Sequence, residues 1–184
     1  MPLFKLFVIP KGPHHKNGMV YYIKQTEPNN MPHDLSIVLV TPEIPNNTGS
    51  IGRLCLATNS KLHLVEPLGF DINDSRVKRA GLDYWKYLQL VRHKNIKAFF
   101  DSLPPDAPKV FFSTKAQTSF FKKSFEKGSY LIFGCETKGL GKELIDTFSQ
   151  DTFHIPQYDS RVRSLNLANT ASIVVYEAIR QLGA

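Results

Sequence analysis

The residues whose types and spacing could support chemistry lie in two polar loops. One loop follows the apolar run Tyr130–Phe133 and begins with Gly134, and it contains the carboxylate of Glu136. The other follows the apolar run Thr152–Ile155, begins with Pro156, and is rich in hydroxyl, amide and guanidinium groups. Gly and Pro end short apolar runs abruptly, as expected for strands that stop at turns. Ligands of open α/β sheets bind where loops leave the carboxyl ends of strands, so the two loops predict one binding site.

The first loop resembles two nucleotide-binding motifs and satisfies neither. The sequence Gly-Leu-Gly-Lys at 139–142 matches the end of a phosphate loop, but that motif needs Gly at the position of Glu136 and Ser or Thr at the position of Glu143. A carboxylate at Glu136 repels phosphate, and Glu143 replaces a hydroxyl that would bind magnesium. The dinucleotide pattern also fails, because its third glycine is replaced by Leu144. The sequence therefore argues against ATP and NAD as ligands.

Composition points to a basic, reduced, non-membrane protein. The chain has 184 residues, of which 42% are hydrophobic, and a formal net charge of +7, which favours a polyanionic partner such as nucleic acid. The two cysteines, Cys55 and Cys135, lie in apolar segments and are typical of buried thiols in a reducing compartment, so we expect a cytoplasmic protein. The histidines are scattered, which predicts no metal site. We expect no signal peptide and no transmembrane span, because Lys5 and Pro10 interrupt and close the one apolar run near the start.

Strand and helix patterns alternate along the chain and predict an α/β fold with a parallel sheet. Ser36–Val40 and Lys61–Val65 are predicted strands around a helix that Asn47 or Thr48 would cap. Further elements are a short helix over Ile96–Leu103, a strand over 109–114 and a basic loop over 115–127. The final helix is predicted by apolar residues at helical spacing, namely Leu167, Ala171, Val174, Ala178 and Leu182.

Residues 1–34 differ in composition from the rest and are predicted to form an extension, loosely ordered, before a domain over 35–184. The segment is rich in Pro, Asn, Gly and His around a short strand-like run at 20–23. Its simplest interpretation is a loosely attached terminus. A second interpretation is an RNA-contacting arm that uses Tyr21, Tyr22 and nearby lysines.

The segment 71–97 is the strongest candidate for contact with nucleic acid. It carries seven basic residues against three acidic ones, with aromatic residues between them. Bases can stack on aromatic rings while cations hold phosphates. The alternative is that Leu82 and Trp85 pack into the core and the charges are only solvated. The predicted RNA-binding residues are Arg76, Lys78, Arg79 and Tyr84.

Three separated motifs give the chain a family resemblance that covers Ser36 to Gly183. They are PEIPNNTGSIGR with the following KRAGLDYW, then FGCETKGLG, then SRVRSLNLANTASIVVYEAIRQ. In order and spacing they resemble the SPOUT class of RNA methyltransferases. Within that class the chain is most similar to the TrmL/YibK group, which methylates the ribose 2′-hydroxyl of the tRNA wobble nucleotide. Cys135 and Ser50 depart from the usual Pro and Asn of the group, and neither change removes a charge.

The resemblance implies a fold, a cofactor and partners. The fold is a parallel-sheet SPOUT fold with a C-terminal trefoil knot, the methyl donor is S-adenosylmethionine, and the substrate is tRNA. It also implies a homodimer with active sites near the interface. Methylation of another RNA site, or RNA binding without catalysis, are the alternatives.

The resemblance also implies roles for residues that match the family motifs. The residues expected at the reacting centre are Asn47, Arg53, Glu136 and Asn166. Those expected to hold the donor are Phe112, Gly134, Ile155, Ser164 and Leu165. The family view often makes the matching arginine the general base. Since guanidinium is effectively always protonated, Arg53 can instead act as an electrostatic clamp on a phosphate and on developing negative charge. The sequence leaves both roles open.

Overall fold

A computed structural model of the chain describes residues 33–72 and 85–183. All its strands join one sheet of seven parallel strands in the order β3-β2-β1-β6-β4-β7-β5. The strands are β1 Ser36–Val40, β2 Lys61–Val65, β3 Leu90–His93, β4 Lys109–Phe112, β5 Thr118–Ser119, β6 Tyr130–Phe133 and β7 Thr152–His154. The α/β class and the parallel sheet predicted from the alternating pattern are therefore confirmed.

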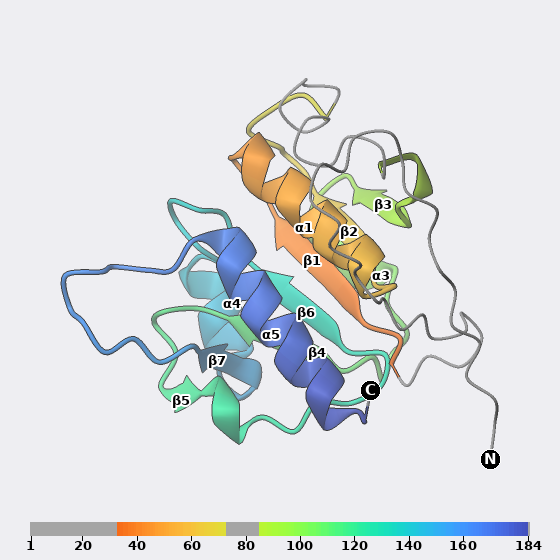
Figure 1. Cartoon of the computed structure of the whole chain (residues 1–184). Helices are drawn as coiled ribbons and strands as arrows, with labels where there is room; N and C mark the ends of the chain where they lie inside the picture. Colours follow the sequence, from red (N-terminus) through yellow and green to blue (C-terminus); the bar gives the residue numbers. More distant parts are fainter. Residues whose placement is uncertain (1–32, 73–84, 184) are drawn as a thin grey trace, which may run out of the picture. The chain divides into compact units, whose positions relative to one another are not determined.

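Helices cover both faces of the sheet. The α-helices are α1 Pro45–Ala57, α3 Ile96–Asp101, α4 Lys142–Thr147 and α5 Leu167–Gln181, and the short 3-10 helices are η2 Trp85–Tyr87, η3 Phe120–Lys122 and η4 Ser149–Asp151. Helices α1 and α5 lie side by side on one face (Figure 1). Helices α3 and α4 pack on the other face.

Two apolar cores result from the alternation of side chains along the strands. On β1, Ile37 and Leu39 point to the core under α1 and α5, whereas Val38 and Val40 point to the core under α3 and α4. Successive side chains of a strand point to opposite faces, so a strand buried on both faces is almost wholly apolar, as β1 is after Ser36. This explains why the continuous apolar runs of the sequence are strands of the sheet interior.

The order of the strands differs from their order along the chain. Strand β6 lies between β1 and β4, and β7 lies between β4 and β5, so two late strands insert between earlier ones. After β7 the chain forms α5, which packs on α1 and β6. Near the end of α5, Gln181 accepts a hydrogen bond from the backbone N–H of Phe125 at 3.0 Å and donates one to the carbonyl of Lys123 at 3.1 Å. These bonds fasten the connection between β5 and β6 to the last helix.

Several local predictions need correction. Helix α1 begins at Pro45, and its N-cap Ile44 makes no side-chain capping bond, so the prediction that Asn47 or Thr48 caps it is wrong. Proline is favoured at the first helical position because its missing N–H has no partner there anyway. The sequence did not predict strand β3, because Leu90–His93 is an edge strand that carries a charged residue. This strand lies in the segment that the sequence assigned to RNA contact. Strand β4 ends at Phe112 rather than at residue 114.

Candidate functional site

Three of the predicted donor-binding residues meet at one edge of the sheet. Strands β6, β4 and β7 are neighbours, and Phe112 is paired in register with both Phe133 and Phe153. Because all three strands are parallel, their carboxyl ends lie together at one edge. Phe112 ends β4, Gly134 follows β6, and Ile155 follows β7. The sheet therefore brings these three positions to adjacent strand ends.

Gly134 lies where two parts of the backbone approach closely. A Cβ atom at this position would stand 2.0 Å from the carbonyl carbon of Gly139 and 2.2 Å from the backbone N of Leu140. The turn closes through a 3.0 Å bond from the N–H of Gly139 to the carbonyl of Cys135. Only glycine permits this approach, so the backbone of residues 139 and 140 packs directly against Gly134.

Three residues of the predicted reacting centre form one hydrogen-bonded chain. Asn47, in the first turn of α1, donates from Nδ2 to Glu136 Oε1 at 2.8 Å and accepts at Oδ1 from Asn166 Nδ2 at 2.9 Å. Asn166 in turn caps α5, because its Oδ1 accepts from the backbone N–H groups of Ala168 and Asn169. These bonds fix which way each amide points. They join α1, α5 and the loop after β6 into one unit.

Glu136 is further held by the backbone that precedes α1. Its Oε2 accepts from the N–H of Glu43 at 2.8 Å, and its Oε1 also accepts from the N–H of Ile44 at 3.2 Å. Since Ile44 supplies no capping side chain, the carboxylate of Glu136 acts as a cap from another element at the positive end of α1. In the opposite direction, the carboxylate of Glu43 accepts from the N–H of Thr137 at 3.2 Å and from its hydroxyl at 2.9 Å.

Arg53 lies on a different face of α1 from Asn47. Six residues advance a helix by about 9 Å and turn it by roughly 600°, so the two side chains leave the axis about 120° apart. Asn47 is buried within the network, whereas Arg53 is exposed. A substrate that contacts Arg53 therefore approaches over the outer surface of α1.

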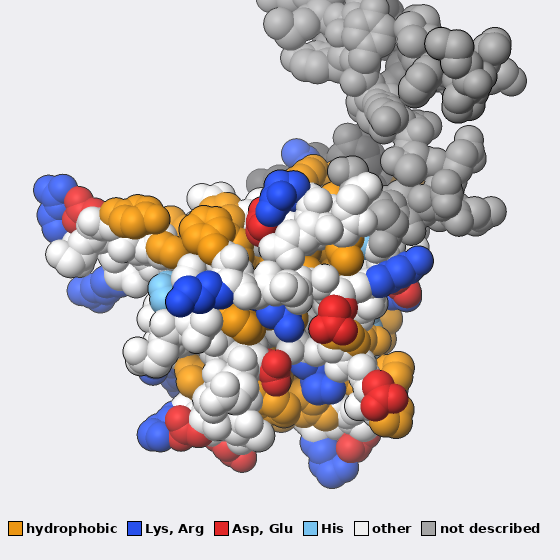
Figure 2. Space-filling model, turned by 90° about the horizontal axis from the view of Figure 1, so that it is seen from below, with side chains coloured by type: hydrophobic (Ala, Val, Ile, Leu, Met, Phe, Trp, Pro, Cys, Tyr) orange, Lys and Arg blue, Asp and Glu red, His pale blue; other side chains and the backbone are white. Residues whose placement is uncertain are grey.

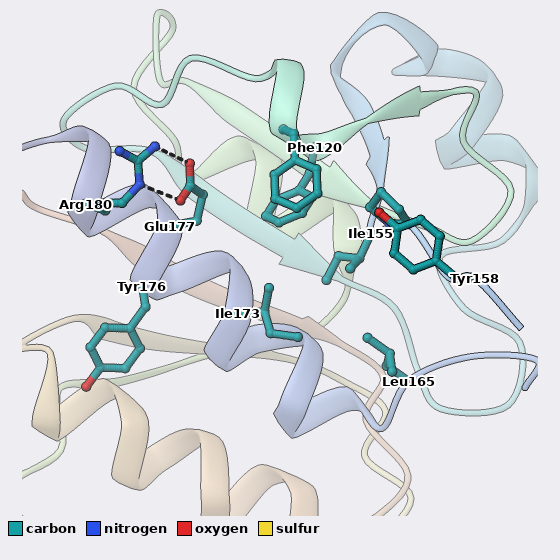
Figure 3. A pocket seen from close by; sticks show the side chains of 10 residues that line it. Phe120, Ile155, Tyr158, Leu165, Ile173, Tyr176, Glu177 and Arg180 are labelled. Atoms are coloured by element: carbon teal, nitrogen blue, oxygen red, sulfur yellow. Dashed lines mark hydrogen bonds and ion pairs between the residues drawn. The ribbon is translucent and has the colours of Figure 1, made fainter.

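A pocket of about 500 Å³ opens beside α5, near the end of β7. Figure 3 shows Ile173 projecting from α5 toward it, with Ile155, Leu165 and the ring of Tyr158 around it. Its lining is mainly apolar and consists of Phe120, Phe121, Ile155, Pro156, Tyr158, Leu165, Ile173, Tyr176, Glu177 and Arg180. Two of the predicted donor-binding residues, Ile155 and Leu165, thus line the same pocket.

One ion pair bounds this pocket along α5. Arg180 donates two hydrogen bonds of 2.8 Å to the carboxylate of Glu177, which also accepts from Gln181. These bonds from Arg180 and Gln181 lower the pKa of Glu177 to about 2. Glu177 is therefore an anion at neutral pH and keeps Arg180 against the helix.

Comparison with known proteins assigns this arrangement to a family. The model of the SpoU rRNA Methylase family matches residues 34–176. The chain belongs to the SpoU rRNA methylase family. Two relatives, from Burkholderia pseudomallei (strain 1106a) and Escherichia coli (strain K12), are named tRNA (cytidine(34)-2'-O)-methyltransferase. The first is 45% identical over 150 residues, which are 80% of this chain and 96% of the relative; the second is 44% identical over 151 residues, 81% and 94%.

Solved structures of related proteins resemble this SpoU-family chain over most of its length. One, described as giving structural insights into the 2-OH methylation of C/U34 on tRNA, matches with a TM-score of 0.79 and 43% identity, covering 82% of this chain and 97% of that one. Another is the SpoU methyltransferase AviRb from Streptomyces viridochromogenes in complex with the cofactor AdoMet. It matches with a TM-score of 0.71 and 28% identity, covering 80% of this chain and 60% of that one.

The structure brings together most, but not all, of the residues predicted for the SpoU-family site. Ser164 is exposed in the loop before α5, and Phe112, Gly134 and Ser164 are not among the residues that line the pocket. The predicted RNA-binding residues Arg76, Lys78, Arg79 and Tyr84 lie outside the described residues. Of their neighbours, Trp85 packs against the core, as the alternative interpretation predicted. Tyr87 is 68% exposed, and its contact with RNA stays a prediction.

Sequence reasoning missed Glu43 and Thr137. Neither matched a motif role, and their partnership across 94 positions is visible only once β1 and β6 are adjacent. Within residues 33–72 and 85–183, no group of three or more His, Cys, Asp or Glu could hold a metal ion. No helix in the described part of the SpoU-family chain is long and apolar enough to cross a membrane.

Proposed function

We propose that this protein transfers a methyl group from S-adenosylmethionine to the ribose 2′-hydroxyl of the wobble nucleotide of tRNA, position 34, where the base is cytidine or a modified uridine. The observation that carries the proposal is the chain Glu136–Asn47–Asn166, which joins one residue from each of three separated motifs. It agrees with the activity for which relatives of about 45% identity are named.

The residues at the sheet edge fit S-adenosylmethionine. A donor of this shape needs backbone groups that hold its polar edge and apolar walls for its ring, as pockets for cofactors usually provide. Gly134 would offer backbone groups where β6 ends, and Ile155 and Leu165 offer apolar side chains that line the pocket. Phe112, stacked on Phe133 with ring centroids 4.9 Å apart, would support this wall, and Ser164 would close it from the following loop. When bound, the donor supplies an activated methyl group on a sulfonium.

The chain's own residues must align the ribose hydroxyl and assist loss of its proton. Arg53 is proposed to hold the phosphate beside the reacting ribose and to stabilise negative charge that develops on the 2′-oxygen. Asn47, Glu136 and Asn166 are proposed to fix α1 and α5 around that centre, since their polar atoms are already engaged with one another.

We also propose a homodimer in which the outer faces of α1 and α5 approach the partner. Exposed apolar side chains gather near these helices, including Ile44, Ile173 and Tyr176. Figure 2 shows apolar surface beside Lys and Arg side chains on one face of the molecule. Because Arg53 leaves α1 on its exposed face, a partner seated there would enclose it and complete the site.

Three further features belong to the same proposal. The C-terminal chain would form a trefoil knot, supported by the insertion of β7 between β4 and β5 and by the bonds from Gln181 to residues 123 and 125.

The tRNA would lie along Arg76, Lys78, Arg79 and Tyr84, supported by the charge of 71–97. Residues 1–34 would be an extension of a methyltransferase domain over 35–184, and two free thiols support a cytoplasmic location.

Mass spectrometry of tRNA nucleosides tests the activity. Cells that lack the gene are expected to lose 2′-O-methylation at position 34, and the purified protein with S-adenosylmethionine should restore it to their tRNA. Unchanged methylation at position 34, with loss at another RNA position, would replace the substrate. Calorimetry that detects tRNA binding but no S-adenosylmethionine binding would identify a non-catalytic RNA-binding protein instead.

A further inference from the structure

The carboxylates of Glu43 and Glu136 join the start of α1 and the loop after β6. We call this pair of reciprocal contacts the clasp. Glu136 accepts hydrogen bonds from the backbone of residues 43 and 44, and Glu43 accepts two from Thr137. Each loop thus provides a carboxylate to the other loop's backbone. Hydrogen bonds in which the acceptor is ionised are roughly twice as strong as neutral ones.

The junction between β1 and α1 is also strained and fastened on its other side. Thr41 has φ of 50°, a left-handed conformation that is unfavourable for a β-branched residue. Its N–H donates to the carbonyl of Val65 at 2.9 Å, and Gly69 donates to the carbonyl of Pro42 at 2.9 Å. A Cβ at Gly69 would stand 2.7 Å from the Cα of Glu43, so the loop after β2 is in tight contact with the junction between β1 and α1. Strain of this kind persists only where the surroundings hold it, and it occurs often at functional sites.

The clasp joins the two halves of the proposed site. Helix α1 carries Asn47 and Arg53, and the loop after β6 carries Gly134. One half is proposed to hold the ribose and its phosphate, and the other to hold the methyl donor. A displacement of about 1 Å between reacting groups can lower a rate by roughly a hundredfold. The reciprocal bonds of Glu43 and Glu136 join the two halves directly.

We infer that Glu43 and Thr137 are positioning residues for methyl transfer, which set the distance of α1 from the donor loop without contacting either substrate. The inference rests on the proposed function. Glu136 shares this task, since both its oxygens already accept hydrogen bonds from the protein.

The test measures turnover, the KM for tRNA, donor affinity and melting temperature in four single variants of the full chain and in the double variant Glu43→Ala/Thr137→Val. Glu43→Ala removes both bonds to Thr137, Thr137→Val removes the hydroxyl bond at constant shape, and Thr137→Ser keeps it. Asp101→Ala is the control, because it also removes one paired carboxylate, here an exposed one that pairs with Lys97 on α3. S-adenosylhomocysteine is the calorimetric probe for the donor site.

Positioning predicts that kcat falls about tenfold in Thr137→Val and more in Glu43→Ala, while donor affinity and the KM for tRNA change by less than about twofold. Thr137→Ser and Asp101→Ala should keep wild-type turnover. The double variant should be no slower than Glu43→Ala, since both changes break the same contact.

Different failures have different meanings. Wild-type turnover in both Glu43→Ala and Thr137→Val would overturn the inference and leave the proposed function standing. Parallel loss of donor affinity and turnover would also overturn it, because the clasp would then serve donor binding. A wild-type protein that binds no donor and methylates no tRNA would overturn the proposed function and the inference together. If Glu43→Ala does not fold, the isosteric variant Thr137→Val alone tests the inference.

Discussion

Asn47 and Glu136, 89 positions apart in the sequence, are joined by a 2.8 Å hydrogen bond between the amide Nδ2 and the carboxylate Oε1. The bond orients the Asn47 amide so that its oxygen faces Asn166. Exchange of nitrogen and oxygen on this amide would break both contacts. The geometry therefore requires an amide at position 47, which donates to Glu136 in the loop after β6 and accepts from Asn166 at the start of α5.

Replacement of Asn47 by aspartate tests this specification. Asn47→Asp puts a second carboxylate against Glu136 in a part-buried site, and we expect the free energy of unfolding to fall by about 1–3 kcal/mol at neutral pH. The loss should shrink as pH falls, because two adjacent carboxylates share a proton. Urea denaturation measures both effects. Asn46→Asp is the control, since Asn46 precedes it on α1 and is exposed; equal effects of the two variants would contradict the prediction.

Gly134→Ala should abolish donor binding and destabilise the fold. The new Cβ would meet backbone atoms at 2.0–2.4 Å, so the turn from Cys135 to Gly139 must open. A comparison with Gly52→Ala isolates the cause, because there the new Cβ meets the Trp85 side chain at 2.8 Å, and a side chain can move. We expect a loss above about 3 kcal/mol for Gly134→Ala and a smaller one for Gly52→Ala, by urea denaturation with calorimetry of S-adenosylhomocysteine. Normal donor affinity in Gly134→Ala would show that the loop does not hold the donor.

The sequence predicted the parts of this fold that depend on local pattern. Short apolar runs identified β1 and β6, because burial on both faces of a sheet leaves a continuous apolar signal. The apolar residues of Lys61–Val65, which end at Glu66-Pro67, identified β2, and helical spacing identified α5. The edge strand Leu90–His93 left no such signal, because two of its four residues are exposed. Motif resemblance identified Asn47, Glu136 and Asn166. It could not identify the reciprocal bond of Glu43 to Thr137, which depends on which strands are neighbours.

A buried histidine pair makes stability depend on pH. His63 Nδ1 and His93 Nε2 are 2.9 Å apart, the rings stack, and Phe99 and Tyr130 pack edge-on against His63. Burial, and then the charges of His93 and Lys61, lower the pKa of His63 to about 4, and burial also lowers that of His93. His63 Nε2 has no hydrogen-bond partner among the described residues, so a proton there would be buried without an acceptor.

The direction in which pH changes the free energy of unfolding follows from the lowered pKa of His63. Above about pH 6.5, His63 is neutral in both the folded and the unfolded chain, and its contribution to the free energy of unfolding is fully present. Between about pH 6.5 and pH 4, only the unfolded chain binds the proton, so the free energy of unfolding falls. His63 should contribute roughly 2–3 kcal/mol to this loss. His63→Gln keeps a polar partner for His93 but does not titrate, so its unfolding free energy should fall less steeply over this range. Parallel curves for wild type and variant, by urea denaturation, would contradict the assignment.

Removal of residues 1–30 should leave the methyltransferase domain intact. The first strand of the described residues, β1, begins at Ser36, and the composition changes near residue 35. A chain that begins at Met31 should keep its melting temperature within about 2 °C and bind S-adenosylhomocysteine as the full chain does. A large loss of either would show that the extension is part of the domain. Weaker tRNA binding with unchanged donor binding would support the interpretation of the segment as an RNA-contacting arm.

Arg53 is the residue on which methyl transfer should depend most. Arg53→Ala removes a side chain from the exposed face of α1 and should change the melting temperature and donor affinity little. Turnover should fall at least about a hundredfold, because the guanidinium is proposed to act at the transition state rather than in binding. Near wild-type turnover in this variant would remove Arg53 from the mechanism.

Arg53→Lys separates the two roles that the sequence leaves open. Lysine keeps the positive charge and loses the planar fork that binds a phosphate through two N–H groups, and it can lose a proton at high pH. If Arg53 acts as an electrostatic clamp, the variant should be slow at every pH. If it acts as general base, turnover of the variant should rise steeply above about pH 9, as the lysine becomes neutral. A pH–rate profile of kcat at saturating tRNA and donor distinguishes the two, and we expect the flat profile because the exposed face of α1 favours contact with a phosphate.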